Sequence, residues 1–134
     1  MAMRALVVED DHISAMVIQE ILLLMGSADV AENGLVAVEK FRDALERGEP
    51  YDCIFLDIMM PKMDGHETLE HIRGIEQERG IWGLDAVKVV MITALGDFDN
   101  VKKSFRGQCD AYLVKPIRRE KILSAVRDLG FDVP

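Results

Sequence analysis

Short apolar runs alternate along the whole chain with longer segments in which apolar residues recur every three or four positions. Each short run has the length of a strand, and each longer segment has the period of a helix. The expected strands are Arg4–Glu9, Ala28–Ala31, Asp52–Asp57, Val87–Thr93 and Ala111–Val114. Strict alternation predicts a parallel sheet covered by helices on both faces. Five strands favour the flavodoxin-like order 2-1-3-4-5, so the predicted fold is a doubly wound α/β sheet.

The expected helices lie at about residues 14–25, 35–48, 64–74, 97–106 and 118–129. In the first, Ser14 is the expected N-cap, and Met16, Val17, Ile21 and Leu24 recur at helical spacing. The third should turn Leu69 and Ile72 inward, with Gly74 weakening its end. Residues 74–85 have no clear period. Trp82 in this stretch is expected to pack against its own domain.

Composition limits the class of protein. With 134 residues, of which 49% are hydrophobic, the chain fits one domain over 1–134 with a core at about residues 4–130. It contains no long apolar span and no secretory leader, which favours a cytoplasmic protein without a membrane segment. The two cysteines and three histidines lack metal-ligand spacing, so a zinc or haem site is not expected and the thiols should be reduced.

Charge is unevenly distributed. The net charge of −8 argues against direct nucleic-acid binding over the whole surface. The segment Lys102–Arg127 contains eight basic and two acidic residues, a net charge of +6, whereas the other eight basic and 22 acidic residues give −14. This segment is either a solvated face or a docking surface for an acidic partner.

Parallel strands place their carboxyl ends at one edge of the sheet, where ligands bind in such folds. The residues expected there are Glu9, Asp10, Asp11, Asp57, Thr93 and Lys115. Clustered carboxylates repel one another, by about 4 kcal/mol for an unscreened pair at 4 Å in a medium of intermediate polarity. Lys115 can offset one charge, and oxygen ligands without histidine favour Mg²⁺ with phosphate oxygens. The edge is therefore predicted to be a metal-dependent phosphate site.

In such a site Asp57 can be a nucleophile toward phosphorus, Thr93 a hydrogen-bond donor and Lys115 a counter-charge. The alternative for Asp57 is a helix cap or a solvated carboxylate. A phosphatase with an aspartate nucleophile is a rival, although it would want a second acid at position 59, which is methionine. A flavin-binding module is disfavoured because the loop after the first strand is acidic.

Four motifs together resemble the receiver domain of two-component response regulators. The resemblance extends from about Arg4 to Gly130. The motifs are Leu-Val-Val-Glu9-Asp10, Ile-Phe-Leu-Asp57-Ile-Met-Met-Pro-Lys-Met-Asp-Gly65, Val-Met-Ile-Thr93-Ala94 and Ala-Tyr112-Leu-Val-Lys115-Pro116. One departure is the stretch 74–85, which is longer than most receivers have between the third helix and the fourth strand.

The resemblance implies a non-enzymatic phosphoacceptor that receives a phosphoryl group on Asp57 from a histidine kinase or phosphotransfer protein. It implies that Asp10 binds Mg²⁺ directly, Glu9 through water and Met59 through its carbonyl, while Asp11 only leads into the helix. Thr93 and Tyr112 would form the switch, Lys115 would contact the phosphoryl group, and the Lys115-Pro116 bond would be cis. The uneven charge makes the basic Lys102–Arg127 surface the expected output, in a monomer or a phosphorylation-dependent dimer.

Overall fold

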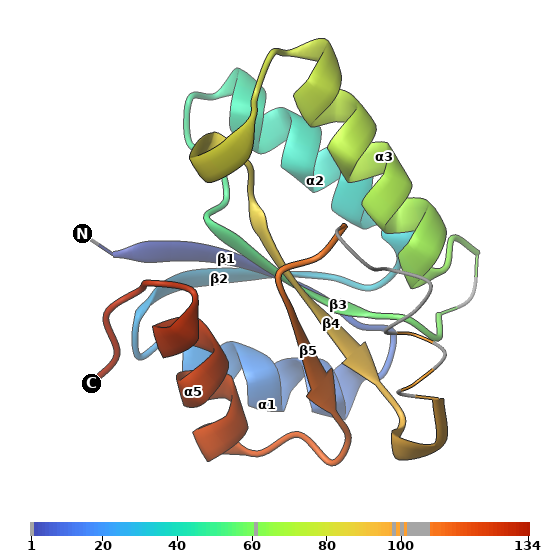
Figure 1. Cartoon of the computed structure of the whole chain (residues 1–134), viewed down its shortest axis with the longest axis vertical. Coiled ribbons are helices and arrows are strands. Elements are labelled where there is room, and N and C mark those ends of the chain that lie inside the picture. Colours follow the sequence, from blue (N-terminus) through green and yellow to red (C-terminus); the bar gives the residue numbers. More distant parts are fainter. Residues whose placement is uncertain (1, 61, 98, 100, 102–107) are drawn as a thin grey trace.

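The computed structural model describes residues 2–60, 62–97, 99, 101 and 108–134. Five parallel strands form one sheet in the order β2-β1-β3-β4-β5 (Figure 1). The strands are Met3–Val8 (β1), Gly26–Ala31 (β2), Cys53–Asp57 (β3), Lys88–Thr93 (β4) and Ala111–Val114 (β5). The predicted fold class and strand order are therefore confirmed.

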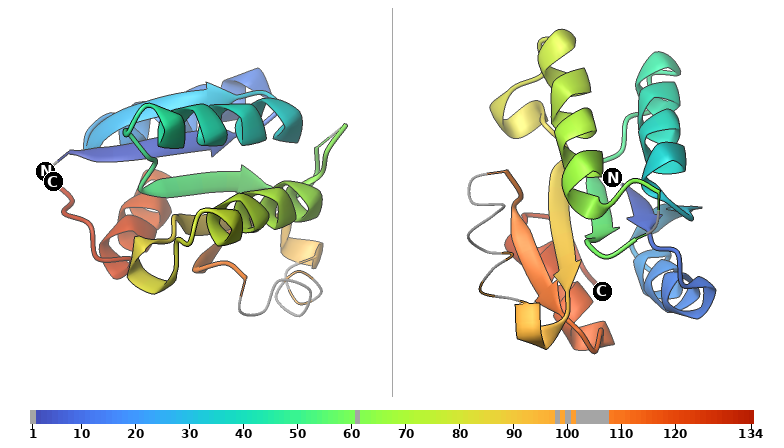
Figure 2. Two further views of the ribbon diagram at one scale, coloured as in Figure 1. Left: turned by 90° about the horizontal axis from the view of Figure 1, so that it is seen from above. Right: turned by 90° about the vertical axis from the view of Figure 1, so that its right-hand side faces the viewer.

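Helices cover both faces of the sheet. They are His12–Leu22 (α1), Gly34–Glu46 (α2), Gly65–Glu78 (α3) and Arg119–Asp128 (α5). Helices α2 and α3 lie on one face, and α1 and α5 lie on the other (Figures 1 and 2). The helix predicted at 97–106 falls mostly outside the described residues. No helix in the described part of the chain is long and apolar enough to cross a membrane.

Each face of the sheet has its own core. The core on one face includes Phe41 of α2 and Leu69 and Ile72 of α3. The core on the other face includes Ile18 of α1 and Ile122 of α5. All five residues of β3 are buried, which explains why the first four are all apolar rather than alternating with polar residues. Burial of each such large side chain contributes about 1.5–3 kcal/mol. Both thiols are free, as predicted.

Helix α1 differs from the prediction in its cap and its buried face. Asp11, not Ser14, is the N-cap, because its carboxylate accepts a hydrogen bond from the Ser14 backbone N–H at 3.1 Å. The buried residues are Ala15, Ile18 and Leu22, whereas the predicted residues Met16, Val17 and Leu24 are about half exposed. Because α1 is apolar nearly all round, its periodicity does not select one face.

The connection between α3 and β4 also differs. Helix α3 continues past Gly74 to Glu78 and is followed by a short 3-10 turn at Gly83–Asp85. Gly74 therefore lies inside the helix, and no described residue outside the neighbouring turns comes within 4 Å of the position of its missing Cβ. The prediction that Trp82 packs against its own domain is wrong, because the turn lies outside both core clusters and leaves Trp82 64% exposed.

Candidate functional site

The carboxyl ends of four neighbouring strands bring the predicted polar residues to one edge of the sheet. They are Glu9 and Asp10 after β1, Asp57 at the end of β3, Thr93 at the end of β4 and Lys115 after β5. The parallel register pairs Val8 with Leu56, Asp57 with Ile92, and Thr93 with Val114. The strand ends are therefore level, and their side chains converge on one small region.

Three carboxylates meet in this region. Glu9, Asp10 and Asp57 each offer an oxygen, and these oxygens all lie within 4.8 Å of one another. Glu9 and Asp57 are buried, with exposed fractions of 3% and 2%, whereas Asp10 is exposed. Carboxylates at such separations repel one another strongly unless a cation or a proton intervenes.

Glu9 shows the effect of this crowding most clearly. Burial, and then hydrogen bonding with and proximity to Asp57, raise the pKa of Glu9 to about 8. Its Oε1 accepts a hydrogen bond from the backbone N–H of Asp11 at 3.2 Å. Its Oε2 is buried and has no hydrogen-bond partner among the described residues. A buried carboxylate oxygen without a donor is costly, and a bound cation would relieve that cost.

The two oxygens of Asp57 have different partners. Oδ1 accepts the backbone N–H of Met59 at 3.1 Å, and Oδ2 lies 3.4 Å from Lys115 Nζ. Lys115 is 42% exposed, so its ammonium reaches Asp57 from the solvent side. The Met59 side chain is 71% exposed. Among the residues that the structure describes, Asp57 is thus held from two sides and has one cationic neighbour.

Thr93 and Tyr112 lie on adjacent strands. The Thr93 side chain is buried, and its Oγ1 donates to the carbonyl of Ala94 at 3.3 Å. Tyr112 is paired with Met91, two residues before Thr93, so Tyr112 and Thr93 project from the same face of the sheet. Burial, and then hydrogen bonding with Cys109, raise the pKa of Tyr112 to about 12.

Asp11 lies beside the cluster but has a structural role. Hydrogen bonds from the side chain and backbone of Ser14 lower the pKa of Asp11, which caps α1. The expectation that Asp11 leads into the helix is therefore confirmed. The Lys115-Pro116 peptide bond is cis, as the resemblance implies.

Gly65, the last residue of the second motif, has a packing role at the site that its place in the motif did not indicate. Its backbone N–H donates to the carbonyl of Ile58 at 3.0 Å, and a Cβ at Gly65 would lie 2.7 Å from the Ile58 Cα and 2.9 Å from the Asp57 carbonyl oxygen. The start of α3 therefore packs directly on the backbone that carries Asp57. The Asp64-Gly65 pair was a visible turn signal, but a signal of that kind does not reveal what the glycine contacts.

The donor set fits a hard divalent cation. All the candidate ligands are oxygens, two of the three carboxylates are buried, and one buried oxygen lacks a donor in the described part of the chain. Mg²⁺ prefers such ligands together with water and phosphate oxygens. The edge of the sheet is therefore suited to Mg²⁺ and an anionic substrate.

Comparison with known proteins connects this geometry with one family. The family model described as the response regulator receiver domain matches residues 5–127. The chemotaxis protein CheY of Treponema pallidum is 38% identical over 125 residues, covering 92% of this chain and 79% of that protein. A probable histidine kinase 2 of Oryza sativa subsp. indica is 34% identical, but the match covers 92% of this chain and only 12% of the kinase.

Solved structures have the same architecture. The CheX-CheY-BeF3-Mg+2 complex from Borrelia burgdorferi contains a chain with a TM-score of 0.79 and 29% identity. The match covers 97% of this chain and 90% of that one. The similarity thus extends over nearly the whole sheet and its helices.

Proposed function

This chain belongs to the response regulator receiver domain family of two-component signalling, and on that premise we propose that Asp57 accepts a phosphoryl group from a histidine kinase or a phosphotransfer protein. One observation carries the proposal. The Asp57 carboxylate is buried, clusters with those of Glu9 and Asp10, and lies 3.4 Å from Lys115 Nζ. A nucleophile, a cation site and a counter-charge are therefore in one place.

In the proposed transfer, a carboxylate oxygen of Asp57 attacks phosphorus. An O–P bond forms while the N–P bond of a phosphohistidine breaks, and the leaving imidazole nitrogen takes a proton from solvent. Lys115 offsets the charge on the phosphoryl oxygens. Glu9, Asp10, Asp57 and the Met59 carbonyl would hold Mg²⁺, which neutralises phosphoryl charge when bound.

The signal would leave the site through Thr93 and Tyr112. We propose that the Thr93 hydroxyl turns from the Ala94 carbonyl to the phosphoryl group, and that the Tyr112 ring then moves inward. This change would shift an equilibrium that is read on the Lys102–Arg127 surface by an acidic protein partner. Arg118, Arg119 and Arg127 of that surface are exposed, whereas residues 102–107 lie outside the described part of the chain.

We further propose one receiver domain over residues 1–134, a cytoplasmic location, no direct nucleic-acid or membrane partner, and a monomer or phosphorylation-dependent dimer. Receiver domains are generally signalling modules rather than enzymes. We expect chemistry on this chain to be limited to self-phosphorylation and self-dephosphorylation.

The direct test is incubation with a small acyl phosphate and Mg²⁺, followed by intact mass measurement. The parent protein should gain one phosphoryl group, and Asp57→Asn should gain none because an amide is not a competent nucleophile. An adduct on Asp57→Asn, or none on the parent, would refute the proposal. Rapid release of phosphate from a phosphate ester, supplied in place of the acyl phosphate, would instead support the rival, an aspartate phosphatase.

Mg²⁺ should stabilise the folded protein. At about ten times its dissociation constant, an ion that binds only the folded state contributes about 1.4 kcal/mol, and we expect the melting temperature to rise by about 5 °C. Asp10→Asn should abolish this rise at the same Mg²⁺ concentration. Asp85→Asn, which removes an exposed acid before β4 at the opposite edge, should retain it. Equal responses in both variants would place the ion elsewhere.

Met59 should make the phosphorylated state long-lived. Its apolar side chain lies two residues after Asp57 and cannot orient an attacking water. The amide of Met59→Asn can orient such a water, and we expect this variant to shorten the phosphorylated lifetime by about tenfold, less than a full general base contributes. The decay of the phosphorylated protein, followed by mass after removal of the donor, measures this effect. Met59→Leu should leave the decay unchanged.

A further inference from the structure

Strand β5 has few interactions of its own to define its register. It has four residues, of which only Leu113 is buried, and among the described strands it pairs with β4 alone. Register is specified strongly where one face of a strand is buried, and weakly in short edge strands with little burial. Lys115 directly follows this strand, so the position of its ammonium depends on the register of β5.

Asp110, directly before β5, makes a two-point contact with β4. Its backbone N–H donates to the Val89 carbonyl at 2.8 Å, and its Oδ2 accepts the Val89 N–H at 2.8 Å. Both backbone groups of Val89 are therefore satisfied by one residue. Displacement of β5 by one residue would break both bonds.

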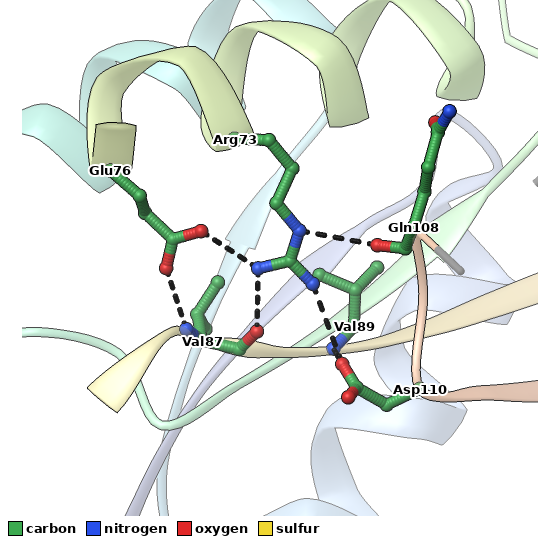
Figure 3. Close-up of polar contacts among 6 residues, drawn as sticks. All are labelled: Arg73, Glu76, Val87, Val89, Gln108 and Asp110. Carbon is green, nitrogen blue, oxygen red and sulfur yellow. Dashed lines mark hydrogen bonds and ion pairs between the residues drawn. The ribbon is translucent and has the colours of Figure 1, made fainter. Parts of the chain in front are cut away.

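Arg73 of α3 holds the same part of the chain (Figure 3). Its Nη2 lies 3.4 Å from Asp110 Oδ2, and its Nε donates to the Gln108 carbonyl at 3.1 Å. One guanidinium thus contacts the residues on both sides of Cys109. Arg73 and Asp110 lie 37 positions apart in the sequence.

Arg73 is itself fixed at the start of β4. Its Nη1 donates to Glu76 Oε1 at 2.7 Å and to the Val87 carbonyl at 2.9 Å. Glu76 is buried, and its Oε2 accepts the Val87 N–H at 2.7 Å. A planar guanidinium can make these contacts at once, whereas an ammonium cannot reproduce their geometry. We call Arg73, Glu76 and Asp110 the α3–β5 clamp.

We propose that Arg73 and Asp110 are positioning residues that set the register of β5 and thereby place Lys115 beside Asp57. At the other end of β5, the Lys115 N–H donates to the Thr93 carbonyl at 2.8 Å, and Lys115 Nζ lies 3.4 Å from Asp57. A slip of one residue would move this end by about 3.3 Å and reverse the side-chain direction. The role of Lys115 in phosphorylation rests on the proposed function. The effect of Arg73 and Asp110 on the register of β5 is independent of that function.

Hydrogen exchange of the unphosphorylated protein tests the register directly. In Arg73→Gln, the Lys115 amide should exchange about tenfold faster, since a charge-assisted network is lost at the other end of the strand. The Phe55 amide in the central strand β3 should change less. Arg79→Gln is the matched control, because Arg79 also lies at the end of α3, where its side chain forms an exposed pair with Glu46 at 3.6 Å rather than a contact with β5. Equal acceleration at Lys115 and Phe55 would overturn the proposal.

A double-mutant cycle tests the effect on the site. Arg73→Gln should slow phosphorylation of Asp57 by about tenfold in the parent but have no further effect with Lys115→Ala, since coupled residues are not additive. Arg73→Lys should recover part of the rate. Equal slowing in both backgrounds would overturn the proposal. If the parent is not phosphorylated, the proposed function fails while the exchange result still decides the register.

A milder variant guards against loss of folding in Arg73→Gln. Asp110→Asn keeps an oxygen that can accept the Val89 N–H and removes the charge beside Arg73. It should accelerate exchange of the Lys115 amide in the same pattern by a smaller factor. If the Lys115 amide exchanges at the parental rate in a folded Asp110→Asn variant, the charge of Asp110 does not hold the register of β5.

Discussion

Replacing Lys115 with alanine should slow phosphorylation of Asp57 by about a hundredfold, the usual effect of removing one preorganised group that stabilises developing charge. Lys115 Nζ lies 3.4 Å from Asp57 Oδ2, and Asp57 is nearly inaccessible to solvent. Without the ammonium, the incoming anion would meet three carboxylates with less positive charge to offset them. The measurement is the initial rate of adduct formation at saturating Mg²⁺.

Two variants separate charge from general effects of mutation. Lys88→Ala removes a lysine at the start of β4, the opposite edge of the sheet, and should leave the rate unchanged. Lys115→Arg keeps the charge on a bulkier group and should recover part of the rate. If Lys115→Ala retains the parental rate while remaining folded, Lys115 has no role in the transfer.

The central strands β3 and β4 were predictable because burial on both faces makes them nearly continuously apolar, and the edge strand β5 was predictable as a short apolar run that ends at Lys115-Pro116. The boundaries of β5 match the prediction at both ends, and β4 begins one residue later than expected. The face of α1 was not predictable, because exposed Met16 and Val17 are as apolar as buried Ile18. Periodicity locates a helix, but which side meets the sheet is decided by tertiary packing.

The candidate site was predictable for a topological reason. Residues that end parallel strands must meet at one edge once the strand order is known, so Glu9, Asp57 and Lys115 could be grouped without a structure. The contacts of Arg73 could not be foreseen in this way. It lies within a helix and reaches Asp110 across 37 positions, and no local pattern of residues encodes a pairing of that kind.

Two glycines of α3 should respond in opposite directions to alanine. Gly65→Ala should destabilise the protein by about 3 kcal/mol, because overpacking against a rigid neighbour costs this much. The added Cβ would lie 2.7 Å from the Ile58 Cα and 2.9 Å from the Asp57 carbonyl oxygen, and both are backbone atoms that cannot rotate away. Relief requires α3 to move from the loop after β3, so the phosphorylation rate should fall as well.

Gly74→Ala is the matched control, since it makes the same substitution in the same helix, where no described residue outside the neighbouring turns of α3 comes within 4 Å of the new Cβ. Alanine is favoured over glycine in a helix interior by about 0.5–1 kcal/mol, so this variant should be stabilised. Urea unfolding measures both changes as shifts of the midpoint at constant slope. Equal destabilisation by the two variants would contradict the role of close packing at Gly65. A stable Gly65→Ala variant with slowed phosphorylation would show instead that the contact positions Asp57 without supporting the fold.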